Sequence, residues 1–280
     1  MQLAVNYSLM ARDLLRGGHI DLDLYKCPDT AESVRAARQD RPAYVHFALH
    51  AGAERVADAD WAHIEHLLEN SDTHYINVHI APNLRDFPGL ELDTRDPAWT
   101  ERLTEATLAD IDHAARRFGA ERVILENVPW DPDPQYAIPR PVLELDVINR
   151  IVRESGCGYL LDLSHARIAA LYLGIDEIAY IDAMPVDRLR ELHITGTRYF
   201  DHESRWRDHY PMLAHDWRLA EHALEQIGRG AWAVPDIVAL ESGGVAESYA
   251  VRVSEAELTA EMKRLAALID AARVQRAALG

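Results

Sequence analysis

The chain has 280 residues, and 46 aspartates and glutamates against 29 lysines and arginines give it a formal net charge of −17. Nucleic-acid affinity comes largely from basic side chains that neutralise phosphates, so this balance argues against a nucleic-acid partner. The hydrophobic fraction of 48% and the charged fraction of 27% are typical of a globular protein, and no run approaches the roughly 18 apolar residues of a membrane span, so no membrane partner is expected.

Short runs rich in β-branched and aromatic residues alternate with amphipathic stretches along the chain. Eight runs have the composition of strands, at residues 3–7, 20–25, 43–49, 75–80, 122–128, 158–163, 190–195 and 236–242. The clearest helical segments are at 61–69, 98–118, 142–154, 216–227 and 255–274. Eight alternations in a length near the typical value of about 250 residues predict an α/β protein with a single (β/α)8 TIM barrel. We expect one catalytic domain over 1–280.

The predicted connections differ at the two ends of the strands. Helix-to-strand turns such as 118–121 and 154–157 are short, whereas the strand-to-helix loops at 82–97, 129–141 and 197–211 are long. Long loops in a compact domain are usually functional. In a barrel they lie at the carboxyl ends of the strands, where the active sites of this fold are built.

Histidine and carboxylate side chains lie near the ends of the predicted strands or in the loops that follow. They are His46, His79, Glu126, Asp162, His165, His193, Asp208, His209 and Glu241. Taken singly, each suits a structural role, and Asp162 is equally well placed to cap a helix that begins near His165. Taken together, nine such groups pointing into one barrel mouth would repel or stay unsatisfied unless cations or protons compensated them, and divalent metal ions do this best. Nitrogen and oxygen donors without thiolate favour iron, manganese or zinc, and the size of the set indicates more than one metal ion.

Other residues carry weaker signals. His50 is expected to pack or face solvent rather than bind metal, and Cys157 enters its strand at the end opposite to the mouth, so it is not expected to be a catalytic thiol. With Cys27 it makes two cysteines, too few for a disulfide framework, and residues 1–6 do not resemble a signal peptide. We therefore expect a cytoplasmic protein.

The predicted loop 197–211 mixes aromatic residues with arginines. This composition suits a substrate clamp or a lid that excludes water, and it equally suits a packed surface loop. On loop position alone, we expect Arg198, Tyr199 and Trp206 to contact the substrate.

Several motifs resemble those of the multinuclear non-haem iron-dependent oxidative enzymes, the family that includes the methanobactin-biosynthesis iron enzyme. They are 125–128 (LENV), 155–166 (SGCGYLLDLSHA), 173–176 (LGID), 180–185 (YIDAMP) and 191–196 (ELHITG). The resemblance covers most of the chain and is densest from 122 to 196. It implies a TIM barrel of the xylose-isomerase-like superfamily.

The resemblance also implies a cofactor, a substrate and a ligand set. The cofactor would be two or three irons in a mixed Fe(II)/Fe(III) centre that itself performs the chemistry, with dioxygen as cosubstrate. The substrate would be a cysteine-containing precursor peptide made by the ribosome for natural-product biosynthesis, often presented by a separate partner protein. Carried over position by position, the iron ligands are His46, His79, Glu126, Asp162, His165, His193, His209 and Glu241, with Asp208 as the ninth. The family usually shows Asp, one residue, then His, whereas here Asp208 directly precedes His209. The chain therefore departs from the family pattern at the ninth ligand, on which a third iron would depend.

Three alternatives stay open. A zinc-dependent phosphodiesterase, similar to barrel endonucleases that act at abasic sites, would use a similar ligand order, but the charge of −17 argues against it. A sugar isomerase or epimerase of the same superfamily would use one divalent metal ion. A basic lysine near the mouth would favour it, whereas lysine is scarce and none is expected at a strand end. A binding module without chemistry would have lost several ligands, whereas eight of the nine positions match the family.

Overall fold

The computed structural model describes residues 1–133, 137–244 and 252–279. Contacts within the chain group it into two compact units. The first unit comprises Met1–His46, Ala62–His74 and Leu189–Gly280, and the second comprises Phe47–Trp61 and Tyr75–Arg188. The expectation of one catalytic domain over 1–280 stays a prediction.

The first unit contains a parallel sheet in the strand order β3-β2-β1-β11-β8. Its strands are β1 (Gln2–Asn6), β2 (Leu24–Pro28), β3 (Ala43–His46), β8 (Leu189–Ile194) and β11 (Ile237–Leu240). Its helices are α1 (Leu9–Arg16), α2 (Ala31–Ala37), α8 (Ala214–Gly228), α10 (Glu255–Ala277) and most of α3 (Trp61–Glu69). Buried side chains from four of these strands form a core cluster of Ala4, Leu24, Tyr44, Ile237 and Ala239. Burial on both faces of the sheet explains why these strands read as continuous apolar runs.

The second unit contains a parallel sheet in the order β7-β6-β5-β4. Its strands are β4 (His50–Ala51), β5 (Ile76–Ile80), β6 (Val123–Glu126) and β7 (Gly158–Asp162). Its helices are α4 (Pro97–Phe118), α5 (Leu145–Ser155), α6 (Leu163–Leu173) and α7 (Glu177–Asp182), with short 3-10 turns η1 (Leu84–Asp86), η2 (Ala120–Arg122), η3 (Arg140–Leu143) and η4 (Val186–Arg188). Alternating strands and helices therefore build both units, as the sequence predicts.

Local signals explain where the second unit's helices begin and end. Asp96 caps α4 and is followed by Pro97 at the first helical position, where the missing N–H of proline costs nothing. Gly156 and Gly174 end α5 and α6 in the left-handed conformation, which glycine adopts without steric cost.

Three details of the predicted elements are wrong. The second strand spans Leu24–Pro28 rather than 20–25, because these residues pair with both β1 and β3. The predicted strand 43–49 is interrupted after His46 and resumes as the short β4. The predicted loop 197–211 is largely an antiparallel hairpin of β9 (Gly196–Phe200) and β10 (Arg205–Tyr210). Of the predicted loop 129–141, residues 134–136 lie outside the described part.

Both cysteines are buried with no exposed surface. Burial raises the pKa of the Cys27 thiol to about 12 and also raises the pKa of Cys157. Because the thiolate is the reactive form, we predict that iodoacetamide at pH 8 modifies both thiols at least about 100-fold more slowly in the native protein than in guanidinium. Mass spectrometry of timed samples would measure this. Rapid labelling of native Cys157 would contradict it and reopen a thiol role.

No helix in the described ranges is both long enough and apolar enough to cross a membrane.

Candidate metal centre

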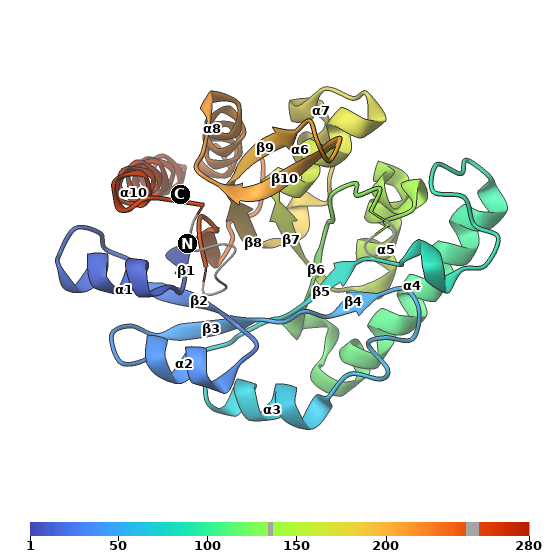
Figure 1. Ribbon diagram of the computed structural model, residues 1–280, viewed down its shortest axis with the longest axis horizontal. Coiled ribbons are helices and arrows are strands. Elements are labelled where there is room, and N and C mark those ends of the chain that lie inside the picture. The colour runs from blue at the N-terminus through green and yellow to red at the C-terminus, as the bar shows by residue number, and fades with distance from the viewer. Residues whose placement is uncertain (134–136, 245–251, 280) are drawn as a thin grey trace. The chain divides into compact units, whose positions relative to one another are not determined.

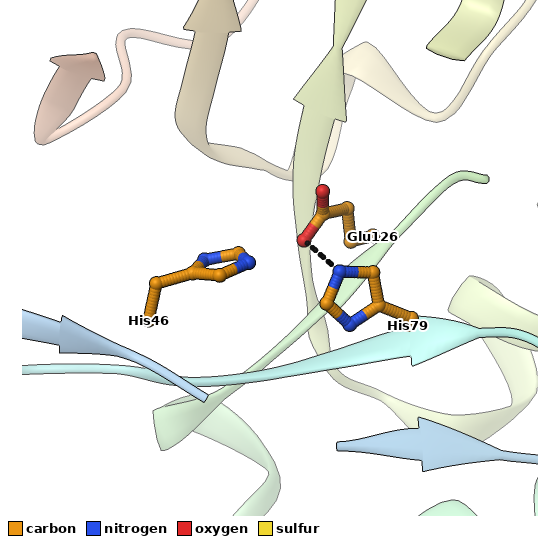
Figure 2. A group of neighbouring side chains, drawn as sticks. All are labelled: His46, His79 and Glu126. Carbon is orange, nitrogen blue, oxygen red and sulfur yellow. Dashed lines mark ion pairs between the residues drawn. The ribbon is translucent and has the colours of Figure 1, made fainter. Parts of the chain in front are cut away.

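In the second unit, neighbouring parallel strands carry the predicted ligands at their carboxyl ends. His79 in β5 lies directly opposite Glu126 in β6 in the strand register. The two side chains point toward each other, with 3.1 Å between His79 Nε2 and Glu126 Oε2 (Figure 2). Asp162 is the last residue of β7, the next strand in the sheet.

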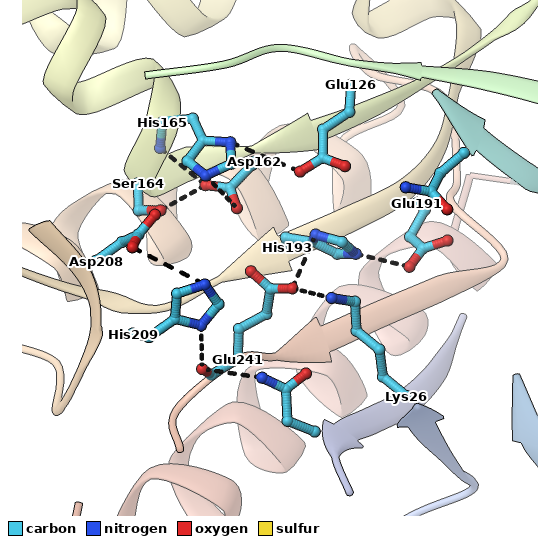
Figure 3. Close-up of polar contacts among 12 residues, drawn as sticks. Lys26, Glu126, Asp162, Ser164, His165, Glu191, His193, Asp208, His209 and Glu241 are labelled. Carbon is cyan, nitrogen blue, oxygen red and sulfur yellow. Dashed lines mark hydrogen bonds and ion pairs between the residues drawn. The ribbon is translucent and has the colours of Figure 1, made fainter. Parts of the chain in front are cut away.

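Asp162 has the capping role that the sequence left open, and its other carboxylate oxygen faces His165. Its Oδ1 accepts hydrogen bonds from the His165 backbone N–H at 2.8 Å and from the Ser164 hydroxyl at 2.6 Å, so it caps α6 (Figure 3). Its Oδ2 lies 3.7 Å from His165 Nε2. One ligand atom each from Glu126, Asp162 and His165 lie within 4.8 Å of one another. We call these three residues and His79 the second-unit group.

The second-unit group is suited to a cation. The exposed fractions of Glu126 and Asp162 are 1% and 0%. Two ionised carboxylates this far from water are costly unless positive charge compensates them, and a divalent metal ion would supply that charge at the observed spacing. The donors are imidazole nitrogen and carboxylate oxygen, which fits iron, manganese or zinc.

Three of the predicted ligand histidines are oriented in the same way. The Nδ1 atoms of His79 and His165 lie 3.0 Å from the Leu49 carbonyl oxygen and 2.9 Å from the Asn127 carbonyl oxygen. In the first unit, His209 Nδ1 lies 2.9 Å from the carbonyl oxygen of Glu241. A ring that donates its Nδ1–H to a carbonyl presents the lone pair of Nε2, which is the usual outer arrangement of metal-binding histidines.

Asn127 is a positioning residue that the ligand prediction missed. Its side-chain amide donates to the Asp162 carbonyl at 2.9 Å, and its side-chain oxygen accepts from the Asp162 backbone N–H at 3.0 Å. That oxygen also accepts the Tyr159 hydroxyl at 3.2 Å, and the backbone carbonyl orients His165. The signal was available in the LENV motif, where the residue directly follows Glu126.

We predict that Asn127→Ala weakens metal binding by about 10- to 100-fold, because the backbone of Asp162 loses both of its hydrogen bonds to the Asn127 side chain. Titration of chelator-treated protein with Fe(II) under anaerobic conditions would measure this. The matched control is Asn149→Ala in α5, whose side chain bonds only to backbone carbonyls of Leu145 and Ala183 among the described contacts. Equal metal affinity of the two variants would remove Asn127 from this role.

In the first unit, Glu241 and His193 form the centre of a buried polar network (Figure 3). Glu241 Oε1 lies 3.2 Å from His193 Nδ1 and contacts the Lys26 ammonium. On the other side of the ring, His193 Nε2 lies 2.7 Å from Glu191, which in turn accepts the Tyr44 hydroxyl at 2.6 Å.

Charge within this network shifts the pKa values of its members. Burial alone would raise the pKa of Glu241, but the positive charge of His193 and Lys26 outweighs burial and holds the pKa well below its usual value. Burial lowers the pKa of His193, but attraction to Glu241 and the bond to Glu191 leave it raised overall. Glu241 is therefore ionised at neutral pH.

His46 and His209 complete the first-unit group, which we define as His46, His193, His209 and Glu241. The rings of His46 and His193 have centroids 5.1 Å apart. His209 follows Asp208 in β10, where the strand register shifts, and His209 itself has a positive φ of 58°. Such a bulge turns a side chain away from its regular direction. Asp208 Oδ1 lies 3.9 Å from His209 Nε2. The two side chains are therefore close in space, although no residue separates them in the sequence.

Two residues near the predicted ligands have surroundings that the sequence did not indicate. His50 faces His79 across β4 and β5, and their ring centroids are 5.0 Å apart. Lys26 lies within β2, and the expectation that no lysine lies near a strand end is wrong. The sequence does show a lone lysine within the apolar run Leu24 to Cys27. Because the predicted strand ended at residue 25, this lysine was not placed in a strand.

The residues predicted to contact substrate lie on the β9–β10 hairpin. Arg198 donates to the carbonyl oxygens of Thr197 at 2.7 Å and Pro211 at 2.6 Å, so it closes the base of the hairpin. The rings of Tyr199 and Trp206 have centroids 5.5 Å apart, and Tyr199 is exposed. Their contact with a substrate stays a prediction.

The sequence matches one family model over most of its length. The family is described as RiPP precursor modification enzyme MbnB/TglH/ChrH, where RiPP denotes a ribosomally synthesised and post-translationally modified peptide, and the match spans residues 26–235. It includes eight of the nine predicted ligands.

Relatives of the chain are UPF0276 proteins. One from Acaryochloris marina is 30% identical over 128 residues, which are 45% of this chain and 45% of that protein. One from Rhizorhabdus wittichii is 25% identical over 203 residues, which are 70% of this chain and 69% of that protein. The chain therefore aligns with less than half the length of the first of these relatives.

Solved structures show the same fold at low sequence identity. A xylose isomerase domain protein from Alicyclobacillus acidocaldarius matches with a TM-score of 0.57 and 15% identity, covering 97% of this chain and 98% of that one. The 3-keto-D-glucoside 4-epimerase of E. coli matches at 0.55 and 17% identity over 94% and 99%. Endonuclease IV from Thermus thermophilus matches at 0.52 and 14% identity over 95% and 99%. These matches confirm the predicted α/β fold of xylose-isomerase-like TIM barrels.

Proposed function

The chain belongs to the MbnB/TglH/ChrH family of RiPP precursor modification enzymes, and from this we propose that it is an iron- and dioxygen-dependent enzyme that oxidatively modifies a cysteine of a precursor peptide. The observation that carries the proposal is the second-unit group, where two buried carboxylates and His165 present ligand atoms within 4.8 Å of one another. This donor set fits iron. Burying the two carboxylates in ionised form without a cation would cost much free energy.

We propose that the nine predicted residues are iron ligands and that the irons are two or three in number, in a mixed Fe(II)/Fe(III) state. The second-unit group supplies His79, Glu126, Asp162 and His165, and the first-unit group supplies His46, His193, His209 and Glu241, with Asp208 beside it. The common orientation of His79, His165 and His209 supports this, because each ring presents Nε2.

When bound, the iron supplies a Lewis acid that lowers the pKa of a substrate thiol and a redox centre for dioxygen. The chain's own residues hold and orient the ligands of the iron. Asn127 fixes the backbone of Asp162 and the ring of His165. Glu126 and Asp162 place negative charge where it holds the metal.

For the peptide, we propose a binding surface on the β9–β10 hairpin. Tyr199 offers an exposed aromatic face beside Trp206, and Arg198 keeps the two strands of the hairpin together at their base. Aromatic side chains bury large contact areas at a low entropic cost. We also propose that a separate partner protein presents the peptide.

The test is metal analysis followed by a peptide assay. Protein purified without chelator from cells grown on iron-57 would be measured for metal equivalents and by Mössbauer spectroscopy. Two to three irons with a coupled ferrous–ferric signal would support the proposal. A mass change at cysteine in a precursor peptide encoded beside the gene, dependent on both iron and dioxygen, would complete it.

Other results would overturn the proposal. Two to three zinc ions with negligible iron, even after reconstitution with Fe(II), would make phosphodiester hydrolysis the leading function. A single loosely held divalent ion would favour sugar isomerisation instead.

A further inference from the structure

Lys26 has an unusual position for a lysine. The sequence has two lysines, Lys26 and Lys263, and the first of them is buried in β2 with an exposed fraction of 6%. Lysine is almost never buried unless its charge is paired. The partner here is Glu241, which is itself 3% exposed (Figure 3). Lys26 therefore forms a buried ion pair with a member of the first-unit group.

The Lys26 ammonium contacts Oε1 of Glu241, the same oxygen that lies 3.2 Å from His193 Nδ1. A metal ion held by Glu241 Oε1 and His193 Nδ1 would therefore have a fixed positive charge at its own ligand atom. Two cations within a few ångströms of each other repel strongly in a medium of low dielectric constant. The ammonium and a metal ion thus compete for Glu241.

The second-unit group is different in this respect. Glu126 and Asp162 contact the imidazoles of His79 and His165, and Asp162 also accepts from the Ser164 hydroxyl and the His165 backbone N–H; none of these groups carries a permanent charge. Glu241 differs because a permanently charged ammonium already lies at one of its carboxylate oxygens.

We propose that Lys26 is a built-in counter-ion that competes with a metal ion for Glu241, so that the nine candidate ligands hold two irons rather than three. The proposal rests on the proposed function, since it concerns the same ligands. It leaves the nine candidate ligands as they stand and makes Glu241 the carboxylate for which a metal ion has to compete with an ammonium.

The experiment compares metal binding by Lys26→Met, Lys26→Met/Glu241→Gln and the unchanged protein. Lys263→Met is the matched control, because Lys263 is exposed on α10. Each protein would be stripped with chelator, loaded with Fe(II) anaerobically and desalted, and its metal equivalents and Tm with and without Fe(II) would be measured.

Lys26→Met is expected to retain about one equivalent more than the unchanged protein, with affinity for that ion raised at least about tenfold. Its Tm should also rise more on addition of Fe(II), because metal binding to the folded state now compensates a buried carboxylate. The double variant lacks both charges and should return to the original metal number. Lys263→Met should match the unchanged protein in both measurements.

An unchanged metal number in soluble Lys26→Met would overturn this inference and leave the proposed function in place. Absence of bound metal from every protein would overturn both. If Lys26→Met does not fold, Glu241→Gln alone decides: with Lys26 already neutralising Glu241, this variant should keep the original metal number, and loss of one equivalent would refute the counter-ion role.

Discussion

Glu126→Gln is expected to bind at least one metal ion fewer than the unchanged protein and to lose more than about 99% of its peptide-modifying activity. Glutamine keeps the shape of the side chain but removes the negative charge. Glu126 lies within ion-pair distance of His79 at 3.1 Å and of His165 at 3.6 Å, so one substitution affects both histidines of the second-unit group. Its exposed fraction of 1% means that water does not replace the lost ligand.

Metal analysis and the peptide assay would be run on the same preparations. The matched control is Glu154→Gln on α5, which removes the same charge from an exposed ion pair with Arg150 and is expected to change neither readout. A Glu126→Gln protein that keeps its full metal content and its activity would contradict the assignment of the second-unit group as the metal centre.

Asp110→Ala is expected to have the largest effect on stability among substitutions outside the ligands. Asp110 in α4 is buried, and its carboxylate accepts four backbone N–H groups of the loop after β4: Gly52 at 3.0 Å, Arg55 at 3.1 Å, Val56 at 2.9 Å and Ala57 at 3.1 Å. Alanine would leave these donors without their acceptor. We expect a loss of roughly 3–5 kcal/mol in the free energy of unfolding and a Tm lower by about 10 °C.

The loop that Asp110 holds has little freedom to rearrange. Gly52 has a positive φ of 139°, and a Cβ at this position would lie 2.4 Å from the side chain of Pro82. Thermal unfolding followed by circular dichroism would measure the effect. Asp112→Ala, two residues along the same helix, removes an exposed carboxylate paired with Arg116 and should change Tm by less than about 2 °C. Similar Tm values for the two variants would show that the loop is held by other contacts.

Most strands and the candidate ligands could be picked out from the sequence because both depend on local pattern. Buried parallel strands appear as apolar runs, and a histidine or carboxylate near the end of such a run, as at His79, Glu126 and Asp162, is conspicuous. The motifs around Glu126 and His193 also indicated the family, which the family match then confirmed.

What the sequence could not predict depends on pairing partners that are distant in the chain. The boundary of β2 is set by its hydrogen bonds to β1 and β3, and the boundary decides that Lys26 lies in a strand and contacts Glu241, 215 residues later. The hairpin at 196–210 likewise depends on antiparallel pairing rather than on composition.

The sequence by itself therefore determined the class of fold, the family and the set of candidate ligands, because periodicity and short motifs are properties of neighbouring residues. Only the tertiary structure decided how those ligands are charged and oriented. The backbone carbonyl of Asn127 orients the ring of His165, 38 residues later, and the Lys26 ammonium pairs with Glu241. The energy of a buried charge depends on what surrounds it in space, and neighbours in the sequence do not specify that.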